Sequence, residues 1–593
     1  MLLSSRMSTT VHARLPDSTH DHIEENPMKH VDPKQTEFAF VFPETPMFSH
    51  LITELDTEET LPATRKRDMV SGLRRVSNGL NRAPDEVPAD PTWLQPRIVK
   101  VAPAALGLSP KSWQNAVSDA RSAMAHFGIV KRRHRHIDDL SPAWRTLWER
   151  VLASKDKTLS LALPRFVHYL NRVGVAPQEV TQAHADSFLE AIIANEISKS
   201  PEVGWINAIN AWNLAVTRIE NWPQTTLEKP RRQKVYKRAD ADLPAGFMAD
   251  LTALMQRMAQ PDPFADGEPT RPLRPHTITA YTRQLKRFAS ELLEAGVPPE
   301  EITSVAALCE PKRAEIGLRA MFERNGNEKN KLIAETAALL RNLASKLDLG
   351  DDVRKQLAQL AARVSMPKQK GMTRKNRDRL RVLQDDKTLQ RLLVMPEKIF
   401  AKPAGNTKPY YAALAREDAL AVAILLCFPL RIKNIASIHI EQHLQNMGDG
   451  RLFLVMNEDD TKTETPIEME LPKDVAKMLK QHLATRAPLL CPKGTVWLFP
   501  RRDGMGPITG NALSARLKKR IRVGTGIEMN AHLFRHLAAM IWLDENPGAY
   551  EVARRILGHS TSSHTINMYS GLETRSAMDA FGALLAQKKE PQK

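Results

Sequence analysis

The chain has 593 residues, with 85 Lys and Arg against 68 Asp and Glu, giving a formal net charge of +17. This length allows several domains, and the basic excess favours a polyanionic partner such as nucleic acid. Its three cysteines, Cys309, Cys427 and Cys491, lie far apart, which argues against a disulfide framework or a thiolate zinc site and indicates a reducing cytosol.

Residues 1–105 mix Pro, Thr and charged residues without a sustained hydrophobic period, and the sequence predicts an irregular or disordered arm there. Four histidines, His12, His20, His22 and His30, are irregularly spaced, which argues against a metal site. The first residues lack an apolar stretch of signal-peptide length, so export is not expected.

Residues 106–230 turn to a helical period, and part of them recurs later in the chain. The stretch RFVHYLNRVGVAPQEVT at 165–181 and the stretch RFASELLEAGVPPEEIT at 287–303 match at a constant offset of 122. In each, Gly is expected to end a helix and the following Pro to prevent its continuation. The pattern predicts one helical module present twice, with convergent helix-end chemistry as the alternative.

The second copy lies in a predicted helical domain at 275–366, which follows a basic, Pro-rich linker at 231–274. Its first helix has an apolar stripe made by Ile278, Tyr281, Leu285, Phe288 and Leu292. Other faces carry the basic residues Arg283, Lys286 and Arg287. These cations are candidates for contact with DNA, and a solvated surface face is the alternative.

A second basic linker is predicted at 367–384, where Arg374 and Lys375 are candidates for contact with a phosphate backbone. From 385 to 593 the order of elements predicts a mixed, mainly helical domain. The apolar run ALAVAILLCFPL at 419–430 is too short to span a bilayer and is expected to be a buried helix.

Chemically active side chains recur through this last domain. Arg431 follows the apolar run and Pro429, and Lys462 stands at the turn of a hairpin predicted from strands at 452–456 and 467–471. Gly558 is expected to end a helix just before His559, and Tyr569 follows ten residues later.

His532 and Arg535 lie one turn apart on a helix with an apolar stripe. The stripe comprises Leu533, Leu537, Met540 and Ile541. His532 and His536 have the spacing of a shared zinc site, but Leu533 stands where a zinc protease needs Glu, so no metal is expected. His536 is interpreted as a packing residue or a support for its neighbours.

In this order, the arginine after an apolar helix, the lysine on a hairpin turn, HLFR, LGH and the tyrosine resemble the tyrosine site-specific recombinases, or phage integrase family. The resemblance covers a catalytic domain at about 385–580 and a core-binding domain at 275–365. Many members carry an acidic residue where Asn434 stands here.

The resemblance implies a role for each residue. Arg431 and Arg535 would hold the non-bridging oxygens of the scissile phosphate, and His559 would donate a hydrogen bond to it. Lys462 would protonate the leaving 5′ oxygen, and His532 would be the general base or proton shuttle. Tyr569 would attack and form a 3′-phosphotyrosine.

The fold class implied is a multidomain, mainly helical protein with helical N-terminal and core-binding domains and a catalytic domain containing a small hairpin. The expected partners are double-stranded DNA at a specific recombination site and further copies of the chain, with a tetramer as the working assembly. Companion recombinases are left open, no cofactor or membrane is expected, and the expected location is the cytoplasm of a prokaryote. A catalytically silent DNA-binding relative and a type IB topoisomerase are the alternatives.

Overall fold

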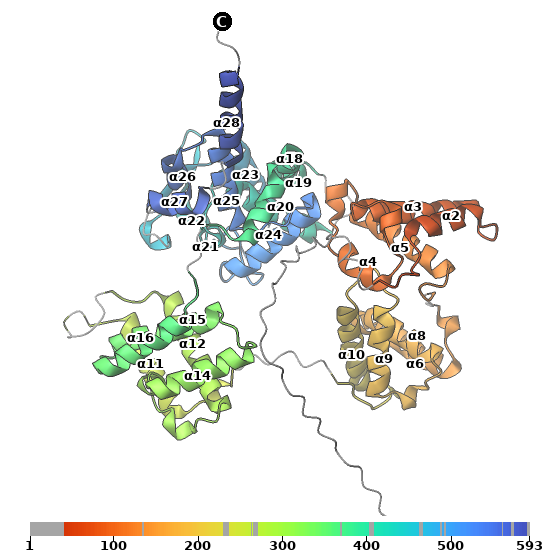
Figure 1. Ribbon diagram of the computed structural model, residues 1–593, viewed down its shortest axis with the longest axis horizontal. Coiled ribbons are helices and arrows are strands. Elements are labelled where there is room, and N and C mark those ends of the chain that lie inside the picture. Colours follow the sequence, from red (N-terminus) through yellow and green to blue (C-terminus); the bar gives the residue numbers. More distant parts are fainter. Residues whose placement is uncertain are drawn as a thin grey trace, which may run out of the picture. The chain divides into compact units, whose positions relative to one another are not determined.

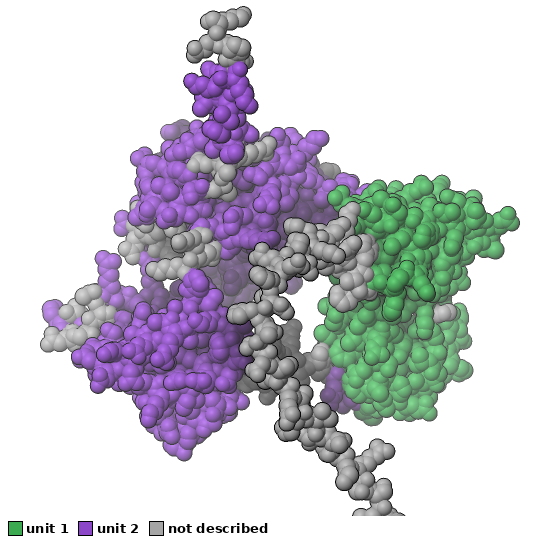
Figure 2. Space-filling view, in the orientation of Figure 1, with its two compact units in different colours: residues 1–101, 111–225 green, residues 102–110, 226–593 purple. Residues whose placement is uncertain are grey.

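The computed structural model describes residues 41–132, 136–228, 237–262, 264, 271–367, 371–402, 408–461, 466–486, 489–491, 494–559, 561–570 and 574–589. It is mainly helical with one small antiparallel sheet, which confirms the predicted fold class. The chain divides into two compact units, residues 1–101 with 111–225 and residues 102–110 with 226–593 (Figure 1, Figure 2). No helix among the described residues is long and apolar enough to cross a bilayer.

The first unit consists of helices and short 3-10 turns. Its elements are α2 (Phe48–Thr57), α3 (Ala63–Gly79), η1 (Pro84–Glu86), α4 (Pro91–Ile98), α5 (Pro110–His126), η3 (Ile137–Asp139), α6 (Pro142–Ala153), α7 (Lys157–Ala162), α8 (Pro164–Arg172), η4 (Pro177–Glu179), α9 (Gln182–Ile193) and α10 (Pro201–Arg218). Three indole rings, those of Trp144, Trp212 and Trp222, pack edge to face in its core. Their burial anchors α6 and α10 to the segment that follows.

The irregular arm predicted for 1–105 is wrong for residues 48–98, which form α2, α3 and α4. Phe48, Leu51 and Leu55 of α2 are buried at helical spacing, and Leu73 and Val76 of α3 are buried with them. Pro and polar residues separate the helices, so no single sequence window carries a long period. Residues 1–40, with the four histidines, lie outside the described residues.

The two copies of the predicted module share their local geometry. Gly174 after α8 and Gly296 after α12 (Pro275–Glu294) have φ of +77° and +87°, the left-handed conformation that glycine adopts without strain. Phe166 and Phe288 are both buried, and each copy continues into a 3-10 turn that starts at Pro177 or Pro299. The sequence match therefore corresponds to the same helix end and the same turn in both places.

The second unit contains two separate hydrophobic cores. The first core belongs to a helical domain, and its elements are η5 (Asp240–Asp242), α11 (Ala245–Ala259), α12 (Pro275–Glu294), η6 (Pro299–Glu301), α13 (Val305–Leu308), α14 (Pro311–Arg324), α15 (Lys331–Lys346) and α16 (Asp351–Arg363). The linker predicted at 231–274 is thus wrong for α11, whose Phe247, Leu251 and Leu254 are buried in this core. The Pro-rich flanking sequence led to the prediction of a linker, although α11 is an ordinary amphipathic helix.

The second core belongs to the C-terminal domain. Its elements are α17 (Arg374–Arg381), η7 (Val382–Gln384), α18 (Asp386–Leu393), α19 (Met395–Ala401), α20 (Pro409–Cys427), α21 (Ile432–Ala436), α22 (Ile440–His443), β1 (Leu444–Asn446), β2 (Leu452–Met456), η8 (Glu458–Asp460), β3 (Ile467–Glu470), α23 (Lys473–Arg486), α24 (Gly510–Thr525), α25 (Leu533–Glu545), α26 (Tyr550–Leu557), α27 (Ser562–Tyr569) and α28 (Thr574–Lys589). The apolar run expected to be buried is the end of α20, where residues 419–425 are buried on all sides.

The linker predicted at 367–384 also needs correction, because α17 and η7 occupy 374–384. Met372, Leu380 and Leu383 are buried in the core of the C-terminal domain, and α17 lies against α25. The segment was predicted as a linker because it is dense in basic residues, but a few apolar side chains attach this helix to the domain. The basic run therefore begins the C-terminal domain instead of leading to it.

The predicted hairpin is present and gains a third strand. The sheet order is β1-β2-β3 with antiparallel pairing, and Leu454 of β2 lies opposite Leu444 of β1 and Met469 of β3. Leu454 and Met456 face the core, while Glu468 and Glu470 are exposed. This alternation is the one expected for a sheet with a single buried face.

Candidate active site

The N-terminal end of α25 carries two of the predicted site residues, His532 and Arg535, and also His536. Leu533 and Phe534 are buried in the domain core, and the side chain of Asn530 accepts a hydrogen bond from the Leu533 amide at 3.1 Å. This fixes the start of the helix, so that His532 remains exposed while Arg535 and His536 are buried. Ile541, predicted to lie on the apolar stripe, is 37% exposed and does not belong to the core.

Arg535 is held by main-chain carbonyl groups. Its Nη1 donates to the carbonyl oxygen of Pro429 at 2.7 Å, and its Nη2 donates to that of Leu557. Burial, together with the charge of Arg431, lowers the pKa of Arg535 to about 10, so the guanidinium stays charged at neutral pH. No carboxylate among the described residues forms an ion pair with it, and its positive charge is therefore not neutralised within this part of the chain.

Arg431 lies just before α21 and next to Arg535, whose pKa it helps to lower. Partial burial lowers the pKa of Arg431 as well. Asn434, three positions after Arg431, is buried, and its amide donates to the sulfur of Met456 at 3.8 Å. The Asn434 side chain therefore faces the small sheet.

Tyr569, the last residue of α27, is buried among these groups with 2% of its surface exposed. Its hydroxyl lies 3.0 Å from Nδ1 of His536, and its ring is parallel to that of His559 at a centroid distance of 6.3 Å. Burial raises the pKa of Tyr569 to about 12, although the charge of Arg535 acts in the opposite direction. The phenol is therefore neutral, and its oxygen contacts an imidazole.

His536 is the residue whose position the sequence did not reveal. Burial, reinforced by His532 and Arg535, lowers its pKa to about 4, so that the ring is neutral at physiological pH. A neutral imidazole can accept a proton at one nitrogen. The signal in the sequence was the spacing of one turn from His532, which does not tell which of the two rings faces a tyrosine 33 residues later in the chain.

The remaining histidines flank this pair. The ring of His532 lies 4.8 Å from that of His536 at an angle of 83°, and the pKa of His532 is lowered by partial burial and by Arg535 and Arg431. His559 follows Gly558, whose φ of +58° ends α26, and its Nδ1 lies 2.9 Å from the hydroxyl oxygen of Thr565 on α27. The structure thus brings Arg431, His532, Arg535, His559 and Tyr569 together, whereas Lys462 lies outside the described residues.

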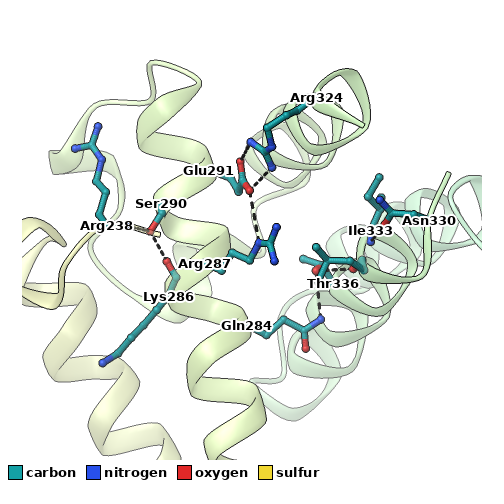
Figure 3. A network of polar contacts seen from close by, with 11 residues as sticks. Arg238, Gln284, Lys286, Arg287, Ser290, Glu291, Arg324, Asn330, Ile333 and Thr336 are labelled. Carbon is teal, nitrogen blue, oxygen red and sulfur yellow. Dashed lines mark hydrogen bonds and ion pairs between the residues drawn. The ribbon is translucent and has the colours of Figure 1, made fainter. Parts of the chain in front are cut away.

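The candidate DNA contacts of α12 have different surroundings. Nζ of Lys286 lies 2.8 Å from a carboxylate oxygen of Asp240, and Nε of Arg287 lies 3.7 Å from the buried carboxylate of Glu291. Figure 3 shows that Arg324 of α14 reaches the same carboxylate from the other side. Arg283 is exposed with no partner among the described residues, as is Lys375, and the side chain of Arg374 is 93% exposed.

A second group of arginines in the C-terminal domain is bound by carboxylates. Arg516 of α24 donates to Asp418 at 2.6 Å and to Glu417 at 2.8 Å, and Arg520 donates to Asp418 at 3.0 Å. Both carboxylates belong to α20 and are 2% exposed. These ion pairs join α24 to the central helix of the domain.

Comparison with known proteins locates one family match. Residues 398–575, which include the cluster around Tyr569, match the model of the phage integrase family. A search of curated protein sequences found no match.

Solved structures of recombinases align with more of the chain at low similarity. The post-cleavage complex of the XerH site-specific recombinase with a palindromic difH substrate covers 58% of this chain and 98% of its own, at 13% identity and a TM-score of 0.33. The XerA recombinase covers 58% and 100% at 14% identity and a TM-score of 0.24. The integrase of mycobacterium phage Brujita covers 56% and 93% at 17% identity and a TM-score of 0.21.

Proposed function

Residues 398–575 form a domain of the phage integrase family, the tyrosine site-specific recombinases, and on this premise we propose that the protein cleaves and rejoins double-stranded DNA at a specific site through a 3′-phosphotyrosine. One observation carries the proposal: the Tyr569 hydroxyl lies 3.0 Å from a neutral imidazole, near Arg535, which main-chain carbonyl groups hold and which forms no ion pair with a carboxylate among the described residues. Such a site combines a nucleophile, a proton acceptor and positive charge.

Tyr569 is the nucleophile in the cleavage step. With a pKa of about 12, only about one phenol in 100,000 is ionised at pH 7, so attack requires removal of its proton. Nδ1 of His536 takes this proton as the phenolic oxygen bonds to phosphorus. His532, one ring away and exposed, passes the proton to solvent.

The bond between phosphorus and the 5′ oxygen breaks as the tyrosine bond forms. Lys462 gives a proton to the departing oxygen, which leaves as a 5′-hydroxyl. Rejoining is the reverse step, in which a 5′-hydroxyl attacks the phosphotyrosine and the phenol regains its proton. Because the ester to Tyr569 conserves the phosphodiester bond, neither ATP nor a metal is needed for the energy balance.

The arginines stabilise the transition state. A guanidinium has five N–H groups, and Arg535 uses two of them on main-chain carbonyls. The others remain to bind the non-bridging phosphate oxygens, which gain negative charge as the phosphorus becomes five-coordinate. Arg431 binds the same phosphate from the start of α21, and His559 donates a hydrogen bond to it.

The C-terminal helix supports an assembly of several copies. α28 exposes Met578, Phe581, Leu584 and Leu585, whose exposed fractions are 61%, 53%, 49% and 43%. These residues recur at helical spacing, so they form an apolar stripe that a second protein surface would cover. We place this stripe on a neighbouring copy in a tetramer bound to two DNA sites.

The test is covalent trapping on DNA. Duplexes that the full-length protein selects from a random pool are nicked beside the cleavage site. After cleavage, the short fragment that carries the 5′-hydroxyl diffuses away, so religation fails. We expect a protein-DNA adduct that resists denaturation and is absent with Tyr569→Phe. Tyr550→Phe, a matched change at the partly buried first residue of α26, retains the adduct.

Three outcomes would overturn the proposal. An adduct that persists in Tyr569→Phe would assign the nucleophile to another residue, and the absence of any adduct in the unmodified protein would indicate a silent DNA-binding relative. Relaxation of supercoiled plasmids that lack a selected site would favour a type IB topoisomerase.

A further inference from the structure

The first unit contains a groove that the proposed reaction does not use. It is a hollow of about 460 Å³ lined by α7, α8 and α9 together with the segments that follow α5 and α9. Cationic side chains dominate its lining, in particular Lys131, Arg132, Arg165, Arg172 and Lys199. We call it the first-unit groove.

The positive charge of the first-unit groove is largely uncompensated. Its one lining carboxylate, that of Glu196, is buried and forms an ion pair with Arg165 at 2.5 Å. Lys131, Arg132 and Lys199 are exposed and have no ion-pair or hydrogen-bond partner for their side chains among the described residues. Three cations therefore face one groove without a neutralising acid.

Hydrogen bonds fix the spacing of the two segments that carry these cations. Arg121 of α5 donates from Nε to the carbonyl oxygen of Asn195 at 3.1 Å and from Nη2 to that of Lys131 at 2.8 Å. The side-chain oxygen of Asn195 accepts from the amide of Lys131 at 2.6 Å. The segment with Lys131 and Arg132 is thus tied to the segment that leads to Lys199, which lowers the entropy lost when a ligand binds both.

The floor of the groove is partly apolar. The rings of Tyr169 and Phe188 lie 5.2 Å apart, and the guanidinium of Arg172 lies 5.7 Å from the centre of the Tyr169 ring. Leu161 is 82% exposed at the groove. Cations around apolar surface suit a ligand with both charged and apolar faces, as a sugar-phosphate backbone has.

In the second copy of the module, the corresponding face does not carry a predominantly cationic groove. At the offset of 122, Tyr169 and Arg172 correspond to Glu291 and Glu294. The hollow beside these residues has a volume of about 760 Å³ and is lined by four glutamates and three basic residues. The glutamates are Glu291, Glu294, Glu315 and Glu323, and the basic residues are Lys312, Arg319 and Arg324.

Ion pairs within the second copy balance that charge. Glu291 pairs with Arg324 and lies near Arg287, as Figure 3 shows, and Arg319 pairs with Glu315 at 2.7 Å. The two copies thus share a helix end but differ in the charge of the same face. The difference indicates that the first copy has a ligand of its own.

We propose that the first-unit groove binds the phosphate backbone of duplex DNA, as a second DNA contact outside the domain that carries Tyr569. The identity of the polyanion rests on the proposed function, which makes DNA the partner of this chain. Three cations that engage phosphates release condensed counterions, so the contact adds to affinity without reading sequence.

The test compares charge-matched variants of the full-length protein. The groove variant carries Lys131→Glu, Arg132→Glu and Lys199→Glu. The control carries Arg74→Glu, Lys111→Glu and Lys157→Glu, three exposed residues of the same unit that do not line the groove. Binding to a short duplex of arbitrary sequence is followed by fluorescence anisotropy between roughly 50 and 200 mM salt.

We expect the groove variant to bind about 10- to 100-fold more weakly at the lowest salt, with a salt slope smaller by about 2 to 3. The control keeps the slope of the unmodified protein. A groove variant with unchanged affinity and slope would overturn the proposal, as would equal losses in both variants. The proposal would also be overturned if the groove variant bound DNA as tightly as the unmodified protein but an acidic polypeptide competed less well with DNA for the variant. That result would assign the groove to a protein partner.

A charge-retaining variant guards against misfolding. Lys131→Arg with Lys199→Arg is expected to bind as tightly as the unmodified protein, and all variants are compared by thermal melting. Adduct formation on the nicked substrate is measured in parallel, because it depends on Tyr569 and not on the groove. Failure of the groove proposal leaves the adduct intact, whereas failure of the proposed function removes it.

Discussion

Two arginines of the C-terminal domain, the buried Arg535 and the partly buried Arg516, differ in what holds them. Arg535 of α25 is bound by the carbonyl oxygens of Pro429 and Leu557, whereas Arg516 of α24 is bound by the carboxylates of Asp418 and Glu417. Carbonyl groups hold an arginine in place without cancelling its charge, whereas carboxylates hold it in place and also cancel its charge. The comparison separates an arginine available to an anionic substrate from one that joins two helices.

The pKa directions agree with this distinction. Burial lowers the pKa of Arg535 to about 10, and the charge of Arg431 acts in the same direction. Burial also acts to lower the pKa of Arg516, but Asp418 and Glu417 outweigh it and raise the value. A phosphate arriving beside Arg535 would therefore supply the anion that the protein itself does not.

The largest effect is expected at Arg535. Arg535→Lys keeps a positive charge but loses the planar fork of donors, and we expect the cleavage rate to fall about 1,000-fold, or about 4 kcal/mol. Arg516→Lys, the matched change in the carboxylate-bound group, is expected to leave the rate per folded molecule nearly unchanged. Single-turnover cleavage of the nicked substrate measures both, and similar losses in the two variants would break the comparison.

The next effect is on stability, at Asp418. Asp418→Asn leaves Arg516 and Arg520 without their shared carboxylate, and we expect the free energy of unfolding of the C-terminal domain to fall by about 3 kcal/mol. Urea denaturation of the full-length protein reports the change in this domain's transition. A stability like that of the unmodified protein would show that the carboxylates are not needed to join α24 to α20.

A smaller effect is expected at His536, the imidazole in contact with Tyr569. His536→Gln retains a hydrogen-bonding side chain but cannot accept the phenol proton as an imidazole does, and we expect cleavage to slow about 100-fold at pH 7. Raising the pH should restore part of the rate, because hydroxide can replace the missing base. A variant with the rate and pH profile of the unmodified protein would assign proton removal to another group.

The smallest effect concerns pH and His482, a histidine of α23 that is buried near the carboxylate-bound arginines. Burial, with Arg486 and Arg416 nearby, lowers its pKa to about 3, so the folded state binds this proton less readily than the unfolded state. Its stabilising contribution is complete above the unfolded pKa of about 6.5 and is lost as the pH falls from there toward the folded pKa.

His482→Leu should therefore flatten the acid side of the stability profile. Between about pH 7 and pH 4.5, we expect the variant to lose about 2 kcal/mol less than the unmodified protein. Both ring nitrogens of His482 lack hydrogen-bond partners in the described structure, so the leucine should not weaken folding at pH 7. Identical profiles would show that the ring is solvated or paired.

Much of the candidate site could be predicted from the sequence, because the ordered motifs locate side chains that lie at the ends of helices. Arg431, His532, Arg535, His559 and Tyr569 come together as the resemblance implied. The contact between His536 and Tyr569 was not predictable, because it depends on how α27 packs against α25. The roles of Asp418 and Glu417 were equally hidden, since their partners lie about 100 residues later in the chain.

The prediction of irregular arms and linkers was wrong for a different reason. The arm, the linker with α11 and the linker with α17 are rich in Pro or charge, yet each helix needs only a few apolar residues at helical spacing to attach to a core. Arg287 was predicted as a candidate for contact with DNA, although Glu291, one turn later in the same helix, offers it an internal partner. That i,i+4 pair was visible in the sequence.

The most direct test of the central claim is to locate the DNA on the protein. The trapped adduct is digested with nuclease and protease, and the modified peptide is identified by mass spectrometry. We expect a nucleotide joined through its 3′ phosphate to the oxygen of Tyr569. A nucleotide on any other residue, or a linkage through a 5′ phosphate, would contradict it.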